Sequence, residues 1–304
     1  MIVLKAICIV IITKERGYTK MKNAFVKIAV VLMALVLACG SFVGCAGEAK
    51  KVKVIDIPLS EEEYAFCVSQ ENTEFLGKVN EFLKKIKDNG KFDEICNNYF
   101  GDGTPLAIES KAEDSSKDQL IVATSTGFEP FEMVDSNGKY SGVDLEIAYY
   151  LAEELGQELV IKDMDFDAVV NSVQSGICDI GMAGLSVTPD RQKVVTFSDS
   201  YYNASQVVIV LEGDTTFDNC KTGEDVAKIL KGLDASTKLG CQQGTTGELY
   251  IKGDDDYGFE KLTAEAAPYK YVALAITAMQ QGQVKYVIAD NGPAKAITSK
   301  LNAQ

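Results

Sequence analysis

The stretch that decides the fold runs from Gln119 to Asp163, QLIVATSTGFEPFEMVDSNGKYSGVDLEIAYYLAEELGQELVIKD. It opens with QLIVATS and closes with ELVIKD, two apolar runs typical of buried strands. Between them Ile147, Leu151 and Leu155 fall on one face of a predicted helix, which Gly156 ends. Two strands joined by a helix of this length predict a right-handed crossover and parallel pairing. The stretch therefore indicates an α/β protein.

The same alternation continues to the end of the chain. Strands are predicted at CDIGMAG, QVVIVL, TKLGCQQ and KYVIAD, with helical segments such as FDAVVNSVQSG, GEDVAKILKGL and YVALAITAMQQGQ between them. Ligands bind such sheets where the carboxyl ends of the strands meet loops and helix N-termini. The loops STGFEPFE, AGLSVTPDR, QQGTTGE and ADNGPA are therefore the candidate binding loops.

The segment before this body has a different character. Residues 52–100 hold a predicted strand pair and one amphipathic helix, too little to bury a core of their own. The apolar face of the helix must therefore pack on the α/β body. Residues 101–118, GDGTPLAIESKAEDSSKD, are polar and rich in turn formers and predict a linker.

Composition excludes several classes of function. The 304 residues include 30 Lys and Arg against 44 Asp and Glu, and the net charge of -14 argues against nucleic acid as a partner. The chain has no histidine, which removes Ser-His and Cys-His nucleophile pairs and most zinc sites, and we expect no metal and no cofactor. Beyond the leader the cysteines follow no disulfide framework, and only a bridge between Cys220 and Cys241 stays open.

The N-terminal region resembles a secretion leader. From Met21 the chain reads MKNAFVKIAVVLMALVLACGSFVGCAG, the form of a bacterial signal peptide, so translation is expected to start there. The ending FVGC resembles a lipobox and predicts lipidation of Cys45, with Cys39 as a rival site. A plain cleaved signal and an uncleaved anchor are the alternatives. We expect a leader over 1–44 and a lipid-anchored tether over 45–51.

Four segments carry a family resemblance: GFEPFEMVDSNGKYSGVDLEIAYYLAEELG, SVQSGICDIGMAGLSVTPDRQKVVTFSDSYY, QQGTTGELY and VIADNGPA. They resemble successive signatures of the solute-binding proteins of amino-acid ABC transporters. The resemblance implies a two-lobed periplasmic-binding-protein-like II fold (Venus flytrap), each lobe a mainly parallel sheet flanked by helices, with two hinge strands. It also implies a monomer on the extracytoplasmic face of the membrane that delivers a free amino acid to a permease.

The order of the segments departs from that family. VKVIDIPLSEEEYAF and TEFLGKVNEFLKKIKDNGKFDEICNNYFG are similar to the last elements of family members, yet here they stand first. The sequence therefore predicts a circular permutation in which the linker 101–118 joins the old termini. The expected large lobe comprises 66–100 plus 119–208, and the expected small lobe comprises 52–59 plus 211–304. The hinges would lie near 60–66 and 208–211.

Four polar residues of the candidate loops suit an amino-acid ligand. Arg191 has the planar fork that holds a carboxylate, Ser186 and Thr246 offer hydroxyls, and Asp290 could accept from an ammonium group.

The resemblance adds Phe128 and Phe166 as aromatics around the ligand side chain, and Gly184 in the same loop as Ser186. Ser125 and Gly127 stand where binders of basic amino acids often place an acid, so we expect a neutral ligand.

Two rival functions share this fold. A dehydratase of the cyclohexadienyl or arogenate type would need a general acid or base in the cleft, and Glu129 and Glu132 are the nearby carboxylates of the first loop. An amino-acid sensor would bind without transport. The sequence favours a binding protein that is not an enzyme.

Overall fold

The computed structural model describes residues 50–303, which fall in one compact unit beginning at Lys50. The expected leader over 1–44 and the expected lipidation site Cys45 lie outside the described residues. Within the described part of the chain, no helix is both long enough and apolar enough to cross a bilayer.

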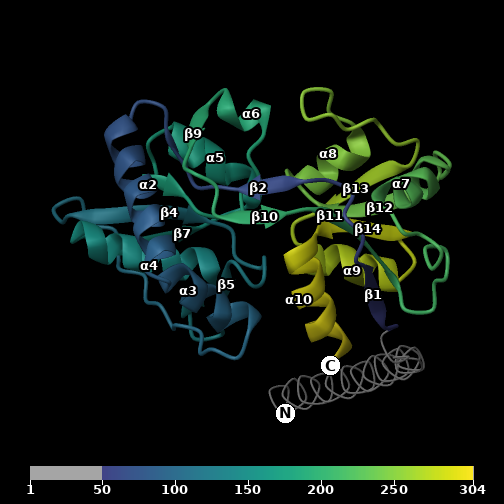
Figure 1. The fold of residues 1–304 in the computed structure, drawn as a ribbon, viewed down its shortest axis with the longest axis horizontal. Coiled ribbons are helices and arrows are strands. Elements are labelled where there is room, and N and C mark those ends of the chain that lie inside the picture. Colours follow the sequence, from purple (N-terminus) through teal and green to yellow (C-terminus); the bar gives the residue numbers. More distant parts are fainter. Residues whose placement is uncertain (1–49, 304) are drawn as a thin grey trace, which may run out of the picture. The chain divides into compact units, whose positions relative to one another are not determined.

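Two five-stranded sheets organise the described residues (Figure 1). The first sheet has the spatial order β7 (Glu158–Asp163), β4 (Gln119–Thr124), β8 (Ile180–Gly181), β3 (Cys67–Ser69) and β9 (Val195–Phe197). The second has the order β1 (Val52–Ile55), β11 (Gln206–Leu211), β14 (Tyr286–Asp290), β12 (Lys238–Gln242) and β13 (Glu265–Tyr269).

Helices accompany each sheet. With the first sheet go α2 (Thr73–Asp88), α3 (Lys91–Phe100), α4 (Val143–Leu155), α5 (Phe166–Gln174), the short α6 (Pro189–Gln192) and the small hairpin of β5 (Met133–Val134) and β6 (Tyr140–Ser141). With the second go α7 (Gly223–Lys231), α8 (Thr246–Lys252), α9 (Val272–Gln280) and α10 (Asn291–Asn302). We call the first group the first lobe and the second group the second lobe.

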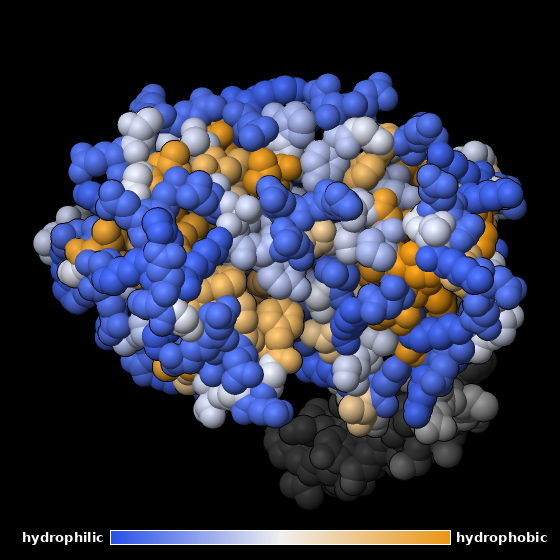
Figure 2. Space-filling view, in the orientation of Figure 1, coloured by the Kyte–Doolittle hydropathy of each residue, from blue (hydrophilic) through white to orange (hydrophobic). Residues whose placement is uncertain are grey.

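A separate pair of strands runs between the two groups in Figure 1. It consists of β2 (Glu62–Tyr64) and β10 (Tyr202–Ala204), which pair antiparallel. We call β2 and β10 the crossing strands. On the face shown in Figure 2, hydrophilic residues cover most of the surface and hydrophobic residues show between them in patches over both lobes.

Parallel pairing is confined to part of each sheet. In the first sheet β4 runs parallel to β7 and β8, whereas β3 is antiparallel to β8 and β9. In the second, β12 runs parallel to β13 and β14, whereas β11 is antiparallel to β1 and β14. The antiparallel strands β1, β3 and β11 connect directly to the crossing strands through short segments, so no helical crossover fixes their direction. Both lobes are α/β, as predicted.

The apolar face of α2 packs where the sequence requires it. Val79, Phe82, Leu83 and Ile86 are buried. They belong to one core with side chains of β4 and α4, such as Leu120. Burial at roughly 25 cal/mol per Å² of apolar area holds this early segment on the α/β body.

The second crossing differs from the expected position near 208–211. β11 begins at Gln206, and its residues Gln206 to Ile209 already pair with β14 of the second sheet. The chain therefore leaves the first lobe along β10, before Gln206. Sequence alone misplaced this point because QVVIVL is one continuous apolar run, and apolar character does not indicate which of two sheets a strand joins.

The linker 101–118 is partly anchored. Ile108 is 1% exposed and exchanges two backbone hydrogen bonds with Tyr140, while the backbone N–H of Lys111 donates to the carbonyl of Leu159. The polar turn at 114–117 is exposed. The cysteines Cys67, Cys96, Cys178, Cys220 and Cys241 are free thiols, so the bridge between Cys220 and Cys241 is not formed.

Candidate functional site

The predicted ligand residues come from loops at the ends of strands in both lobes. Ser186 and Arg191 follow β8 and flank the start of α6, and Thr246 opens α8 directly after the loop that leaves β12. Asp290 ends β14 and caps α10. Hydrogen bonds connect the side chains of Ser186, Thr246 and Asp290 through Glu62 and Gln206, and Arg191 joins them at the backbone carbonyl of Ser186.

The carboxylate of Glu62, on crossing strand β2, lies at the centre of that network. The hydroxyl of Ser186 donates to Glu62 Oε2 at 2.6 Å, and the hydroxyl of Thr246 donates to the same oxygen at 2.7 Å. Ser60 donates to Glu62 Oε1 at 2.7 Å. Glu62 is 4% exposed, so these are charge-assisted hydrogen bonds shielded from water. Both hydroxyls that the sequence assigns to a ligand carboxylate thus hold a carboxylate of the protein.

Arg191 connects the two lobes. Its Nη1 donates to the carbonyl oxygen of Ser186 at 2.6 Å, and its Nη2 donates across the lobes to the carbonyl oxygen of Gly244 at 3.1 Å. The guanidinium carbon lies 5.2 Å from the ring centroid of Phe166, in a cation–π contact. Burial lowers the pKa of Arg191, and the charges of nearby acids, Glu62 among them, oppose that shift. A guanidinium has five N–H donors, so these two bonds leave donors for a further acceptor.

Asp290 is a buried acid whose charge is costly. It is 4% exposed, and the side-chain amide of Gln206 donates to its Oδ1 and, at 3.0 Å, to the hydroxyl of Thr246. Burial raises the pKa of Asp290 well above its usual range, and the nearby charge of Glu62 raises it further. The Gln206 amide and the charge of Arg191 act in the opposite direction. A cation placed beside Asp290 would favour its ionised form.

The two predicted aromatics lie differently. Phe128 is 4% exposed in the core of the first lobe, where its ring centroid lies 6.4 Å from that of Tyr64. Phe166 begins α5 and stacks on Arg191 as described.

Gly184 must be a glycine in this arrangement. Its φ is +52°, and an added Cβ would come within 2.6 Å of the Phe128 ring. Its backbone N–H donates to Asp144 at 2.9 Å, so that group already has an acceptor within the protein.

Ser125 and Gly127 form the predicted wall beside the ligand side chain, and neither residue carries a charge. Ser125 is 3% exposed, and a Cβ on Gly127 would come within 3.0 Å of the ring of Tyr271 in the second lobe. The neighbouring Thr126 bonds Asp163 through both its backbone N–H and its hydroxyl, at 2.9 and 2.6 Å.

Polar contacts join the rims of the two lobes. Lys270 pairs with Asp165 at 2.7 Å, Lys193 with Asp256 at 3.2 Å, and Lys300 with Glu129. The side-chain amide of Gln243 donates to Asp167 at 2.7 Å. Together with the bond from Arg191 to Gly244, these contacts hold the lobes against one another.

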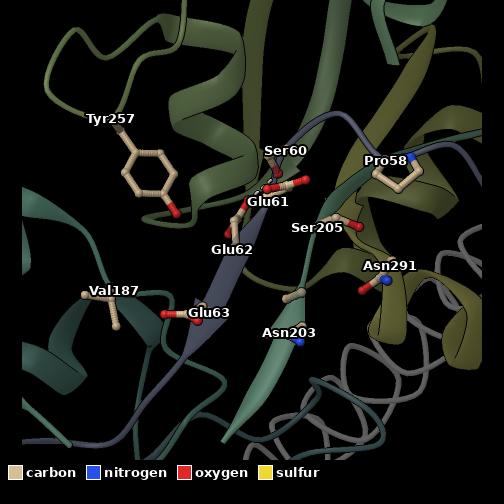
Figure 3. Close-up of a pocket in the computed structure, with 11 residues that line it drawn as sticks. Pro58, Ser60, Glu61, Glu62, Glu63, Val187, Asn203, Ser205, Tyr257 and Asn291 are labelled. Carbon is tan, nitrogen blue, oxygen red and sulfur yellow. Dashed lines mark hydrogen bonds between the residues drawn. The ribbon is translucent and has the colours of Figure 1, made fainter. Parts of the chain in front are cut away.

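A cavity of about 810 Å³ lies along the crossing strands (Figure 3). Three consecutive acidic residues line the cavity: Glu61, which precedes β2, and Glu62 and Glu63 of β2. Figure 3 shows Tyr257 of the second lobe turned toward Glu62. The other lining residues are Pro58, Ser60, Val187, Asn203, Ala204, Ser205 and Asn291. A smaller cavity of about 410 Å³ lies between Gly127, Met133 and Tyr271.

Sequence reasoning missed two residues of the network, Glu62 and Gln206. Glu62 and Tyr64 are buried whereas Glu63 between them is exposed, the alternation expected of a strand with one face inward. The run SEEEYAF holds three consecutive glutamates, so its residue types do not show which of them faces inward.

Comparison with known families gives a match over the middle of the chain. The model of the bacterial extracellular solute-binding proteins, family 3, matches residues 120–282. The chain belongs to this family.

Relatives and solved structures give the same picture. The chain is 31% identical over 157 residues to the arginine-binding extracellular protein ArtP of Bacillus subtilis, covering 52% of this chain and 57% of that protein. It is 27% identical to a probable histidine-binding protein of Neisseria gonorrhoeae, with 58% and 63% covered. The chain thus spans about three fifths of the length of the curated relatives it matches.

Among solved structures, a mutant of ArgBP from T. maritima has a TM-score of 0.50 at 31% identity, covering 60% of this chain and 72% of that chain. The ancestral amino acid-binding protein AncCDT-1, a precursor of cyclohexadienyl dehydratase, has a TM-score of 0.51 at 31% identity, with 61% and 75% covered. These likenesses support the two-lobed binding-protein fold that the sequence predicts.

Proposed function

We propose that this protein captures a free amino acid between its two lobes. One observation carries the proposal: Ser186 and Arg191 of the first lobe and Thr246 and Asp290 of the second are linked in one hydrogen-bond network through Glu62, Gln206 and the carbonyl of Ser186. An α-amino acid brings a carboxylate for the first three and an ammonium group for Asp290. Because the contacts come from both lobes, the ligand is fully satisfied only when the lobes are closed, and binding favours closure.

The proposal predicts that Arg191→Ala weakens binding of the best amino-acid ligand by about 2 to 5 kcal/mol, since the ligand carboxylate would be buried without its guanidinium partner. Isothermal titration calorimetry of the full-length protein measures the change. Asp290→Ala should have an effect of similar size through the ammonium group.

The control for this experiment is Lys84→Ala. It removes an exposed cation of α2 whose partner is Asp88, within the same helix, so binding should stay within about twofold of the unmodified protein. Normal binding by Arg191→Ala would refute the site assignment.

We propose further that the protein delivers the captured amino acid to the permease of an ABC transporter. In this proposal the protein acts outside the cytoplasm as a lipid-anchored monomer. Relatives are named as ABC transporter, extracellular and periplasmic binding proteins, which supports this location and role. Lipidation of Cys45 would supply the anchor. Mass spectrometry of the membrane fraction would detect an acylated peptide beginning at Cys45.

Circular permutation is the proposed reason for the unusual order of the chain. The family model matches only 120–282, yet β1 and β3, which precede that range, complete the two sheets. The two ends of the described chain also meet: the side chain of Asn302 accepts from the backbone N–H of Val52 at 3.0 Å and donates to its carbonyl at 2.7 Å. In this proposal the large lobe combines 66–100 with 119–205, and the small lobe combines 52–59 with 206–304.

A dehydratase is the second candidate, favoured by the likeness to AncCDT-1. Its acid would be Glu132, which is fully buried and has a pKa raised well above its usual range by burial and by Asp144. Turnover of prephenate or arogenate by the purified protein would establish it. Glu132 is 0% exposed and is not among the residues that line either of the two cavities described above, which favours binding over catalysis.

The charge of the ligand side chain is a separate question. The uncharged wall of Ser125 and Gly127 favours a neutral ligand, whereas several relatives are named for arginine. The buried carboxylate of Glu62 at the centre of the network also bears on this charge.

A further inference from the structure

We propose that Glu62 is the residue that selects the charge of the ligand, favouring an amino acid with a cationic side chain. The inference rests on the proposed function, because it concerns the same site. It adds an acid on crossing strand β2, which neither the binding loops nor the uncharged wall of Ser125 and Gly127 would suggest.

The carboxylates of Glu62 and of an amino-acid ligand compete for the hydroxyls of Ser186 and Thr246. Ser186 and Thr246 donate to Glu62 Oε2 at 2.6 and 2.7 Å. Each hydroxyl has one proton to donate, so the same two protons cannot also bind the carboxylate of a ligand. A ligand held by Ser186, Thr246 and Arg191 must therefore displace Glu62 from both hydroxyls.

Once displaced, the carboxylate of Glu62 needs a new partner for its charge. Glu62 is 4% exposed and would keep only the hydrogen bond from Ser60, and an ionised carboxylate that loses its other two hydrogen bonds in such a place is disfavoured unless a cation approaches. Arg191 is already bonded to the carbonyls of Ser186 and Gly244 and would hold the ligand carboxylate. The remaining cation is the one that the ligand itself can bring.

Charge balance leads to the same conclusion. Arg191 contributes one positive charge, and Glu62 and Asp290 contribute one negative charge each when Asp290 is ionised by a ligand ammonium group. A neutral amino acid is a zwitterion, so its complex retains one buried negative charge. An amino acid with a cationic side chain brings the sum to zero, which removes that cost.

The surroundings of Glu62 can receive such a side chain. The cavity of about 810 Å³ is lined by Glu61, Glu62 and Glu63, and none of its described lining residues is a lysine or an arginine. Tyr257 adds an aromatic ring beside Glu62 in the same cavity, and a tyrosine face can contact a guanidinium or ammonium group (Figure 3).

The test compares arginine with citrulline, which has the same length but an uncharged end group. Calorimetry on the full-length protein should give arginine an affinity about 100-fold above that of citrulline, as expected for a buried charge with and without its partner. The uncharged amide of Glu62→Gln needs no cationic partner. The affinity of this variant for arginine should therefore fall about 100-fold, while its affinity for citrulline should stay equal or rise.

Glu81→Gln is the matched control, because it makes the same chemical change at an exposed residue of α2 that does not line this cavity. It should leave the ratio of arginine to citrulline unchanged. Thermal unfolding of each variant shows whether it is folded, and the ratio in the unmodified protein tests the proposal even if Glu62→Gln fails to fold.

The outcomes separate this inference from the proposed function. If the unmodified protein binds citrulline or another neutral amino acid as tightly as arginine, lysine or histidine, the selection by Glu62 is overturned while amino-acid capture stands. An unchanged ratio in folded Glu62→Gln overturns it in the same way. If none of the twenty amino acids binds, amino-acid capture itself fails, and the role of Glu62 fails with it.

Discussion

At the scale of single residues, burial changes the chemistry of the acids most. Asp290 could be identified from KYVIAD as a strand-end acid, but its raised pKa arises from the tertiary structure, through burial and then the charge of Glu62. The charged groups that face it are Glu62 and Arg191, with the buried hydroxyl of Tyr64 nearby. The empty site therefore holds a proton on Asp290 more tightly than a free carboxyl would.

This proton makes ligand binding dependent on pH. An ammonium ligand favours ionised Asp290, so the pKa of Asp290 falls on binding and a proton is released. Below the pKa of the empty protein, affinity should fall by up to about tenfold for each unit of decreasing pH, and above it affinity should level off. Calorimetry in two buffers of different ionisation enthalpy measures the protons released.

The check on this prediction is Asp290→Asn, which cannot titrate. Its weaker binding should vary little with pH over the same range. Affinity of the unmodified protein that is constant from about pH 5 to 8, with no proton release, would show that the pKa of Asp290 is not raised in the empty site.

At the scale of elements, the contacts between rims determine how readily the lobes stay closed. The pairs of Lys193 with Asp256 and of Lys270 with Asp165 are exposed, and each connects a loop of one lobe to a loop of the other. Exposed ion pairs contribute little individually, at most about 1 kcal/mol. Their place matters more than their number, because they stabilise the closed form and not either lobe alone.

We expect the double variant Lys193→Ala and Lys270→Ala to bind its amino acid about 3- to 10-fold more weakly, since closure then begins from a more open population. Small-angle scattering of the empty protein should show a larger radius of gyration. The effect should shrink as salt is added, because exposed pairs are screened.

Lys84→Ala again provides the comparison, since its ion pair lies within α2. It should change neither affinity nor radius. Equal affinity of the double variant and the unmodified protein at low salt would indicate that the rim contacts do not contribute to closure.

At the scale of the whole molecule, the order of the chain and the pairing of its strands are independent. β1 completes the second sheet beside β11, and β3 lies inside the first sheet between β8 and β9, although both strands precede the rest of their sheets. A fold specified by side-chain contacts does not require one order of segments, provided the old and new ends lie near each other.

Restoring the usual family order should therefore preserve the fold. Ile108 is buried and pairs with Tyr140, so the new ends belong in the exposed turn between Ser115 and Ser116. A chain that begins at Ser116, joins Gln304 to Lys51 and ends at Ser115 should unfold cooperatively and bind within about threefold of the original. Circular dichroism and calorimetry measure both properties. A chain that does not fold would contradict the permutation.

The sequence determined the α/β class, the family and the four ordered motifs, because these depend on local hydrophobic periodicity and on residues close in the chain. It also identified Ser186, Arg191, Thr246 and Asp290, whose chemistry suits an amino acid wherever they lie; their role in binding remains a prediction.

Contacts between distant segments were decided only by the tertiary structure. Glu62 lies 124 residues from Ser186 and 184 from Thr246, and no local pattern says that these three side chains meet. The crossing before Gln206 was hidden for a similar reason, since one apolar run fits either sheet. Periodicity records which side of a strand is buried, whereas the partner on that side is set by packing of the whole chain.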